Sequence, residues 1–203
     1  MITKLFPTHV YYENLTSASG SLQKQLLKEC YQLRDYDKKG RKWSESNYAG
    51  GYTSYSSMSE LFRFSSTFEN LKNKIDRHVK KFANTLDMDV KNHKLEMTNL
   101  WVNIVPKGTF HSLHLHPVSS ISGTFYVQVE KKSSKIKFED PRMTCFMGSV
   151  PRKPSAKLEN QRFYKLLPQN GHVLLFESWL RHEVEQNMSE QDRVSISFNY
   201  NWF

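Results

Sequence analysis

Three of the chain's eight histidines lie close together, in the stretch His111-Ser112-Leu113-His114-Leu115-His116-Pro117. On an extended strand, side chains two residues apart point to the same face. His114 and His116 would then project together, at a separation that one metal ion can bridge, and imidazole suits iron, zinc, copper and nickel. A single histidine is usually only a polar residue with a partner, but two at this spacing favour a metal site that needs a third ligand from elsewhere.

Two histidines in the C-terminal half are candidates for that third ligand. His182 lies inside a strand-like run, whereas His172 follows the turn sequence Asn170-Gly171, where a histidine is commonplace. His182 is therefore the better candidate. His111 stays open as an alternative ligand in the first stretch, although its spacing from His114 suits a helix better than a strand.

The last strand-like run, residues 193–202, alternates strictly between polar and apolar side chains, and Arg193 and Ser195 lie on its polar face. A guanidinium binds a carboxylate through a two-pronged fork, and a hydroxyl adds one more donor. The pair therefore predicts a carboxylate clamp. The alternative is a polar face that is simply exposed to water, as is common for a C-terminal strand.

Composition limits the class of protein. With 203 residues, 38% of them hydrophobic and 13% aromatic, the chain can bury the core of one substantial domain. The net charge of +9 raises nucleic acid as a partner, but the lysines are scattered and no arginine-rich run occurs, so nucleic-acid binding is not favoured. Two distant cysteines, no signal sequence and no apolar run long enough to span a membrane predict a reducing, cytoplasmic location.

The spacing of apolar residues predicts the elements that position these side chains. Residues 4–12 favour a strand, 22–35 a helix that stops at Gly40, and 41–57 a long surface loop. A second amphipathic helix follows, with Thr67 as its N-cap and an apolar stripe that comprises Phe68, Leu71, Ile75, Val79, Phe82 and Leu86. Strands are expected at 95–105, 111–118, 121–130, 135–139, 162–167, 172–177, 180–186 and 193–202. We expect one domain, 1–203, in which a strand and helices in 1–94 support a sandwich or barrel in 95–203.

Several of these segments, taken in order, resemble the iron(II)/2-oxoglutarate-dependent dioxygenases, and among them a small bacterial and phage group. The resemblance rests first on His114-x-His116, the distant His182 and Arg193-x-Ser195. It extends to the segments Trp101-Val102-Asn103, His114-Leu115-His116-Pro117, Ser122-Gly123-Thr124-Phe125-Tyr126-Val127, Phe138-Glu139-Asp140-Pro141-Arg142, Ser178-Trp179-Leu180-x-His182 and Arg193-Val194-Ser195-Ile196-Ser197-Phe198-Asn199. It covers residues 97–203 well and the N-terminal helices more loosely.

The resemblance implies a mostly β fold with N-terminal helices: a double-stranded β-helix (jelly roll, cupin-like) with helices packed on the outer sheet. It implies Fe(II) bound by His114 and His182, and it puts His116 where the superfamily normally has Asp or Glu. One carboxylate and two imidazoles leave a ferrous site at +1, whereas three imidazoles leave it at +2, and Zn(II) or Cu(II) then compete harder. Acidic side chains that compete with His116 for the third position are Glu139, Asp140 and Glu183, and the three-histidine set is preferred to them.

The same resemblance implies that Arg193, helped by Ser195, binds the distal carboxylate of 2-oxoglutarate, with Asn103 and Tyr126 as further contacts. The implied enzyme is a dioxygenase that hydroxylates an unactivated C–H bond while 2-oxoglutarate becomes succinate, in the cytoplasm of a bacterium or a phage-infected host cell. The prime substrate stays open among protein, nucleotide and metabolite, and a homodimer stays open too. Two alternatives remain: a metal-binding jelly roll without catalysis, and a three-histidine oxygenase that ignores 2-oxoglutarate, against which the Arg193-x-Ser195 pair argues.

Overall fold

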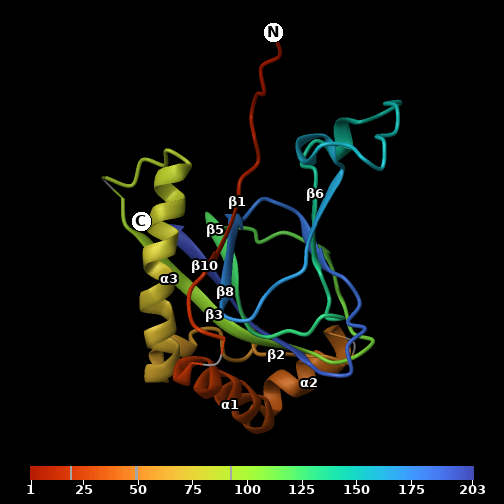
Figure 1. The fold of residues 1–203 in the computed structure, drawn as a ribbon. Coiled ribbons are helices and arrows are strands. Elements are labelled where there is room, and N and C mark those ends of the chain that lie inside the picture. Colours follow the sequence, from red (N-terminus) through yellow and green to blue (C-terminus); the bar gives the residue numbers. More distant parts are fainter. Residues whose placement is uncertain (19, 49, 92) are drawn as a thin grey trace.

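The computed structural model describes residues 1–203 except 19, 49 and 92, and it contains two antiparallel sheets that face each other (Figure 1). The larger sheet consists of β1 (Val10–Asn14), β8 (His172–Glu177), β5 (Ile121–Gln128), β10 (Arg193–Trp202), β3 (Leu95–Val105) and β2 (Tyr52–Thr53), in that spatial order. The smaller sheet consists of β4 (His111–His114), β9 (His182–Val184), β6 (Ile136–Glu139) and β7 (Phe163–Leu166). This arrangement is a double-stranded β-helix, which confirms the predicted fold class.

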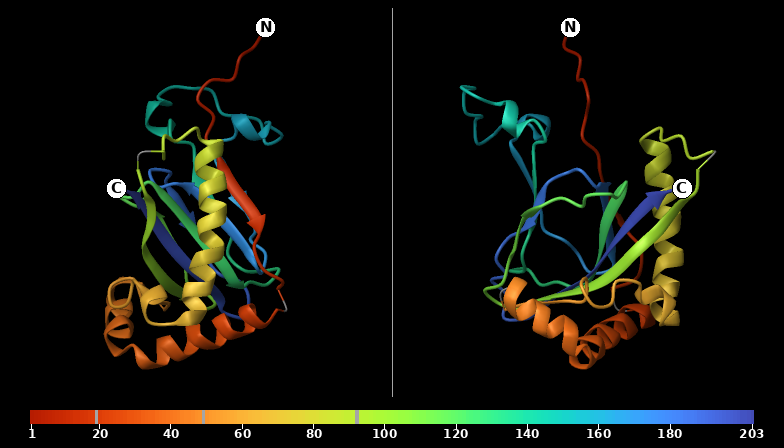
Figure 2. Two further views of the ribbon diagram at one scale, coloured as in Figure 1. Left: turned by 90° about the vertical axis from the view of Figure 1, so that its left-hand side faces the viewer. Right: turned by 180° about the vertical axis from the view of Figure 1, so that it is seen from behind.

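Helices cover the outer face of the larger sheet and close one end of it (Figure 2). The α-helices are α1 (Ser21–Tyr36), α2 (Lys38–Asn47) and α3 (Ser66–Thr85), and single 3-10 turns lie at Leu61–Arg63, Met143–Cys145 and Leu158–Asn160. The apolar stripe of α3 is buried in the core that the helix forms with the sheet, as predicted; it comprises Phe68, Leu71, Ile75, Val79 and Phe82. None of the described helices is long and apolar enough to cross a membrane.

Strand β10 shows how the larger sheet separates its two faces. Val194, Ile196 and Phe198 point outward into the core shared with the helices. The alternating residues Arg193 and Ser195 point inward, toward the smaller sheet, and are 2% and 1% exposed. The polar face of this strand is therefore inside the protein, and the alternative of a water-exposed polar face is wrong.

The expectation of a helix stop at Gly40 and of a long loop over 41–57 is also wrong. Gly40 lies inside α2, and β2 follows in the same region. The reason is the buried Asp37, whose carboxylate caps α2 by accepting a hydrogen bond of 2.8 Å from the N–H of Gly40. The other carboxylate oxygen accepts from the hydroxyls of Tyr52, at 2.9 Å, and Ser57. Tertiary contacts thus fix a segment whose local composition is typical of a loop; residue 49 lies outside the described residues.

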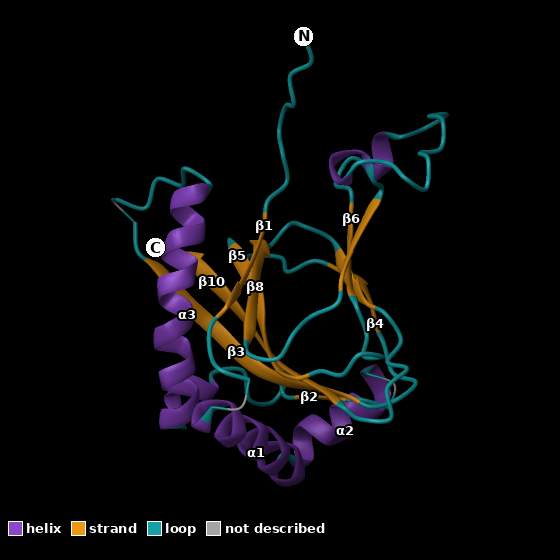
Figure 3. Cartoon of the chain, in the orientation of Figure 1, coloured by secondary structure: helices purple, strands orange, loops and turns teal. Residues whose placement is uncertain are grey.

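Smaller differences concern the ends of elements. Ser65, not Thr67, caps α3, because its side-chain oxygen accepts from the backbone N–H groups of Thr67 and Phe68. The first strand starts at Val10 rather than residue 4, and β4 ends at His114, so the expected strand 111–118 is shorter than predicted. β1 pairs with β8 and β2 with β3, so the segment 1–94 contributes strands to the same sheet as the segment 95–203 (Figure 3).

Candidate metal and co-substrate site

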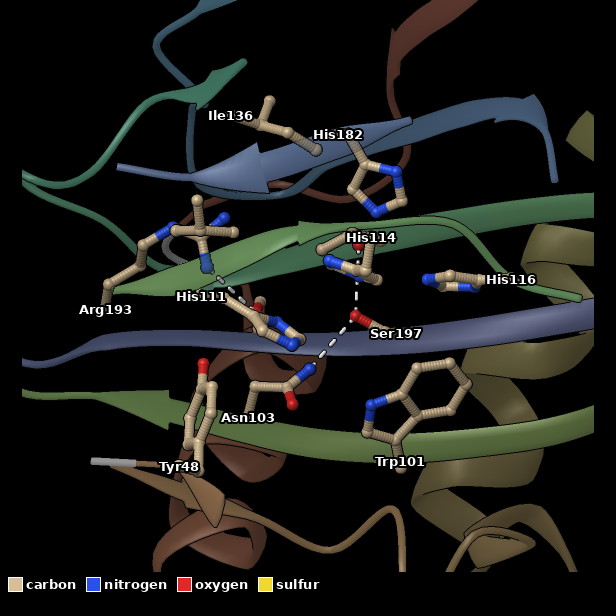
Figure 4. A pocket seen from close by; sticks show the side chains of 13 residues that line it. Tyr48, Trp101, Asn103, His111, His114, His116, Ile136, His182, Arg193 and Ser197 are labelled. Atoms are coloured by element: carbon tan, nitrogen blue, oxygen red, sulfur yellow. Dashed lines mark hydrogen bonds between the residues drawn. The ribbon is translucent and has the colours of Figure 1, made fainter. Parts of the chain in front are cut away.

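Three histidines converge on the inner side of the smaller sheet (Figure 4). His114 is the last residue of β4 and pairs directly with His182, the first residue of β9. His116 lies two residues beyond the end of β4, and its backbone N–H donates to the backbone carbonyl of Ser178 at 3.0 Å. Each ring offers one nitrogen, and these three nitrogens all lie within 4.8 Å of one another. Such a cluster is able to hold one metal ion, and these are the three residues predicted as metal ligands.

The tautomer of each of these rings follows from its hydrogen bond. The Nδ1 atom of His114 lies 2.8 Å from the carbonyl oxygen of Ser112, and that of His182 lies 2.9 Å from the carbonyl oxygen of Leu180. The Nδ1 atom of His116 lies 2.7 Å from the side-chain oxygen of Asn199. These oxygens only accept, so each Nδ1 carries the hydrogen and each Nε2 keeps its lone pair. This is the usual outer support of metal-binding histidines.

Burial keeps the imidazoles neutral. It lowers the pKa of His116 to about 4 and holds the pKa of His182 well below its ordinary value. The pKa of His114 is also lowered by burial. At neutral pH all three rings are therefore uncharged, which is the form that binds a metal.

His111, the alternative ligand, is a fourth ring beside this cluster. It stacks on His114 with ring centroids 4.2 Å apart and meets Tyr48 edge-on at 5.1 Å. Burial lowers its pKa to about 3, helped by the neighbouring histidines and by Arg193. Its nitrogens do not belong to the group within 4.8 Å, so the structure gathers His114, His116 and His182 and leaves His111 between them and the arginine.

None of the acidic alternatives joins the cluster, because each binds a cation elsewhere. Glu139 accepts from Arg181 at 2.9 Å, and Asp140 binds Arg142 at the same distance. Glu183 binds Lys137 at 2.8 Å, and this ion pair joins neighbouring strands. The described part of the chain thus provides no carboxylate in the position of His116.

Arg193 lies at the other end of the same pocket, and it is a buried cation without a counter-ion among the described residues. One guanidinium nitrogen donates to the hydroxyl of Ser195 at 3.2 Å, while Nε has no hydrogen-bond partner. The guanidinium carbon lies 5.2 Å from the ring centre of Tyr126, whose buried hydroxyl also lacks a partner. Burial raises the pKa of that hydroxyl even though Arg193 opposes the shift, so the tyrosine is neutral.

The remaining wall of the pocket is polar and internally bonded. Asn103, on β3, donates to the hydroxyl of Ser197 at 3.0 Å, and that hydroxyl lies 3.1 Å from the hydroxyl of Thr124 (Figure 4). Asn103 therefore lines the pocket as expected, but its side-chain nitrogen is already bonded within the wall. The predicted residue Tyr126 lies beside Arg193 rather than beside the histidines.

Sequence reasoning did not identify two aromatic residues of this pocket. Tyr48 is only 5% exposed and directly follows the last residue of α2, in the segment predicted as a loop; its burial raises its pKa to about 12. Trp101 lies beside His116, with ring centroids 5.8 Å apart, and its outer neighbour is Tyr55 at 4.9 Å. Trp101 shares strand β3 with Asn103 at a spacing of two, and that alternation was the available signal. No local feature of the sequence indicates Tyr48.

The fold and the site together define a class: a jelly-roll protein with a cluster of three histidines able to hold a metal ion and a buried arginine at the opposite end of the same pocket. Comparison with protein families gives the same answer, since residues 99–199 match the model described as "Putative 2OG-Fe(II) oxygenase". The chain belongs to this 2OG-Fe(II) oxygenase family. No match was found among curated proteins.

Solved structures with the same fold are distant in sequence. A prolyl-4-hydroxylase from Pseudomonas putida is 12% identical, with a TM-score of 0.60, over 96% of this chain and 92% of that one. A prolyl hydroxylase from Trichoplax adhaerens, in complex with a hypoxia inducible factor peptide fragment, is 15% identical, with a TM-score of 0.64, over 94% and 82%. HygX from Streptomyces hygroscopicus, with nickel, 2-oxoglutarate and hygromycin B bound, is 14% identical, with a TM-score of 0.62, over 96% and 83%. At these identities the similarity concerns the fold.

Proposed function

We propose that the protein is an Fe(II)- and 2-oxoglutarate-dependent hydroxylase in which His114, His116 and His182 bind the iron. Arg193, with Ser195, binds the distal carboxylate of 2-oxoglutarate. The observation that carries the proposal is Arg193 itself: it is 2% exposed, has an unpartnered Nε and forms no ion pair with a described residue. A buried cation without an anion is costly, and a dicarboxylic co-substrate that reaches from the histidines to this end would neutralise it.

The residues present fit the implied metal. One ring nitrogen from each of the three histidines lies within 4.8 Å of the other two, and each Nδ1 already bonds an acceptor, which leaves Nε2 to bind the metal. When bound, iron supplies the activation of dioxygen by which a C–H bond of the substrate becomes C–OH, while 2-oxoglutarate becomes succinate and CO₂. The chain contributes position and polarity: the fork of Arg193 holds one end of the co-substrate, and Tyr126 stays a neutral donor beside it.

Asn103 is the weaker of the proposed contacts to the co-substrate. Its side-chain nitrogen donates to Ser197, so its free oxygen is an acceptor that suits a donor rather than a carboxylate. We keep it in the proposed site as a wall residue that holds Ser197 and, through that hydroxyl, Thr124.

The prime substrate stays open among protein, nucleotide and metabolite. The ligands named for the solved structures, a hypoxia inducible factor peptide and hygromycin B, belong to different chemical classes. Trp101 lines the histidine end of the pocket and packs against the exposed ring of Tyr55, and we propose that the substrate enters there. We also propose a reducing, cytoplasmic location, because both cysteines are free.

The test measures 2-oxoglutarate binding and turnover separately. Metal-free protein is loaded with Fe(II) under anaerobic conditions, 2-oxoglutarate is titrated by calorimetry, and succinate is measured after oxygen is admitted. We expect 2-oxoglutarate to bind only to the metal-loaded protein and to yield succinate slowly even without prime substrate. Metal binding without any 2-oxoglutarate binding would leave the two other readings, a non-catalytic metal-binding jelly roll or an oxygenase that does not use 2-oxoglutarate, and would refute this one.

A further inference from the structure

The three candidate ligands differ in how their outer nitrogens are held. His114 and His182 each bond the backbone carbonyl two residues earlier in their own segment. His116 lies beyond the end of β4 and has no such carbonyl partner; its Nδ1 bonds the side chain of Asn199 at 2.7 Å, across the pocket on β10. His116 is thus the only one of the three whose outer support is a side chain, and it also occupies the position that, by the resemblance, the wider superfamily normally gives to Asp or Glu.

Asn199 is itself held firmly. Its side-chain oxygen accepts a second hydrogen bond, of 2.8 Å, from the hydroxyl of Ser122 on β5. The hydroxyl of Ser178 lies 2.7 Å from that of Ser122, and the backbone carbonyl of Ser178 accepts a hydrogen bond from the backbone N–H of His116. These three polar residues are buried, at 5%, 0% and 0% exposure for Asn199, Ser122 and Ser178. A closed ring of hydrogen bonds therefore starts and ends on His116.

The backbone of β10 is also irregular at Asn199. The pairing of β10 with β3 is irregular between Asn199 and Tyr200. An irregularity of this kind changes the direction of a side chain at the point where it occurs, and such features are common next to functional sites. Here it lies at the residue whose amide oxygen reaches His116.

We propose that Asn199 is a positioning residue of the metal centre: its side-chain oxygen, held by Ser122 and Ser178, fixes His116 as the Nδ1–H tautomer and aims its Nε2 at the ion. Without this acceptor, Nε2–H is an equally accessible tautomer, and that form has no lone pair toward the site. The inference deepens the proposed function and rests on it for the nature of the metal.

Substitutions at Asn199 test the proposal with opposite expected results. Zn(II), which needs no protection from oxidation, is titrated into metal-free protein by calorimetry. Asn199→Leu removes the acceptor and is expected to weaken Zn(II) binding by roughly 10- to 100-fold, the range usual for loss of an outer partner of a metal-binding histidine. Asn199→Asp keeps the acceptor and adds negative charge, so it is expected to bind Zn(II) at least as tightly as the unmodified protein.

Asn99→Leu is the matched control. Asn99 pairs directly with Asn199 in the sheet and bonds Thr98 and Ser59, with no bond to a histidine. Its loss is expected to leave the Zn(II) dissociation constant within about twofold. Equal weakening by Asn199→Leu and Asn199→Asp, or no weakening by Asn199→Leu, would overturn the positioning role.

A spectroscopic measurement on the metal-free, unmodified protein does not depend on whether any variant folds. Long-range ¹H–¹⁵N correlation spectra distinguish the two imidazole tautomers, and His116 is expected to show hydrogen on Nδ1. Hydrogen on Nε2 would refute the proposal even if the protein bound metal and turned over 2-oxoglutarate. Conversely, an Nδ1–H signal that is lost in Asn199→Leu would support the positioning role even if the wild-type protein showed no oxygenase activity.

Discussion

Replacement of Arg193 by Met tests the co-substrate clamp most directly. Methionine fills a similar volume but has no charge and no donor. Arg193 is 2% exposed, and the only hydrogen bond that its side chain makes to a described residue goes to Ser195. A carboxylate bound there forms a buried, charge-assisted pair with the guanidinium. In the variant, the same carboxylate would be buried without its cation.

The size of the effect follows from that burial. Removing one partner of a buried ion pair costs about 3–5 kcal/mol, and about 1.4 kcal/mol corresponds to tenfold in affinity. We therefore expect the dissociation constant of 2-oxoglutarate to rise by roughly 10²- to 10⁴-fold, measured by calorimetry on the metal-loaded protein. Arg193→Lys keeps the charge but loses the two-pronged guanidinium fork. Its dissociation constant for 2-oxoglutarate is therefore expected to lie between those of the unmodified protein and Arg193→Met.

Two further measurements on Arg193→Met separate a clamp from a structural residue. Arg193 makes no hydrogen bond to a histidine, so Zn(II) affinity is expected to stay within about threefold of the parent. Because the substitution removes a buried cation that lacks a counter-ion, the metal-free variant is expected to melt at the same or a higher temperature. Equal losses of metal and 2-oxoglutarate binding, or a strongly destabilised metal-free variant with unchanged 2-oxoglutarate affinity, would refute the reasoning.

Three more predictions concern the same pocket. Ser195→Ala removes one neutral donor, worth about 1 kcal/mol, and is expected to weaken 2-oxoglutarate binding about fivefold in the same titration, without changing metal affinity. His111→Ala is expected to leave the Zn(II) dissociation constant within about threefold, whereas His182→Ala abolishes binding; comparable losses would make His111 a ligand. The folded pKa of His116, about 4, lies below the unfolded value of 6.5, so protons favour the unfolded state as the pH falls through this interval. Stability of the metal-free protein is thus expected to be highest above pH 6.5 and to decline from there toward pH 4, and Zn(II) affinity is expected to stay nearly constant between pH 8 and pH 6. A loss of about fourfold per histidine over that last range, which imidazoles with the ordinary pKa would give, would contradict the burial argument.

The sequence was informative where the spacing of polar and apolar residues follows directly from which faces of an element are buried. In β10, the alternate residues Val194 to Tyr200 pack in the core shared with the helices, whereas Arg193, Ser195 and Ser197 line the pocket, so the alternation was visible without tertiary information. The stripe of α3 is equally direct, since Leu71, Ile75 and Val79 are all essentially inaccessible. Both elements were predicted within a residue or two of their observed positions.

The sequence was misleading where a distant partner decides the local structure. Helix α2 contains Gly40 and few apolar residues, and its start depends on Asp37, which Tyr52 and Ser57 hold from further along the chain. Tyr48 reaches the pocket because this helix ends there, so the residue could not be assigned before the helix was recognised. His116 was expected on a strand and lies after its end; it reaches the cluster through Ser178 and Asn199, contacts that no spacing rule contains.

The distribution of hydrogen bonds along the inner face explains why the site is expected to be stabilised by its ligands. Moving along β10, Asn199 is satisfied by Ser122 and the His116 ring, and Ser197 by Asn103. Near Arg193 the buried polar groups no longer all have hydrogen-bond partners. Nε of Arg193 and the neighbouring Tyr126 hydroxyl are two of the three buried side-chain atoms without a partner found in the described residues. The unmade hydrogen bonds at the Arg193 end lower the stability of the ligand-free protein, and a carboxylate that binds there restores it. Metal and 2-oxoglutarate together should therefore raise the melting temperature by more than the metal alone, and this additional increase should disappear in Arg193→Met.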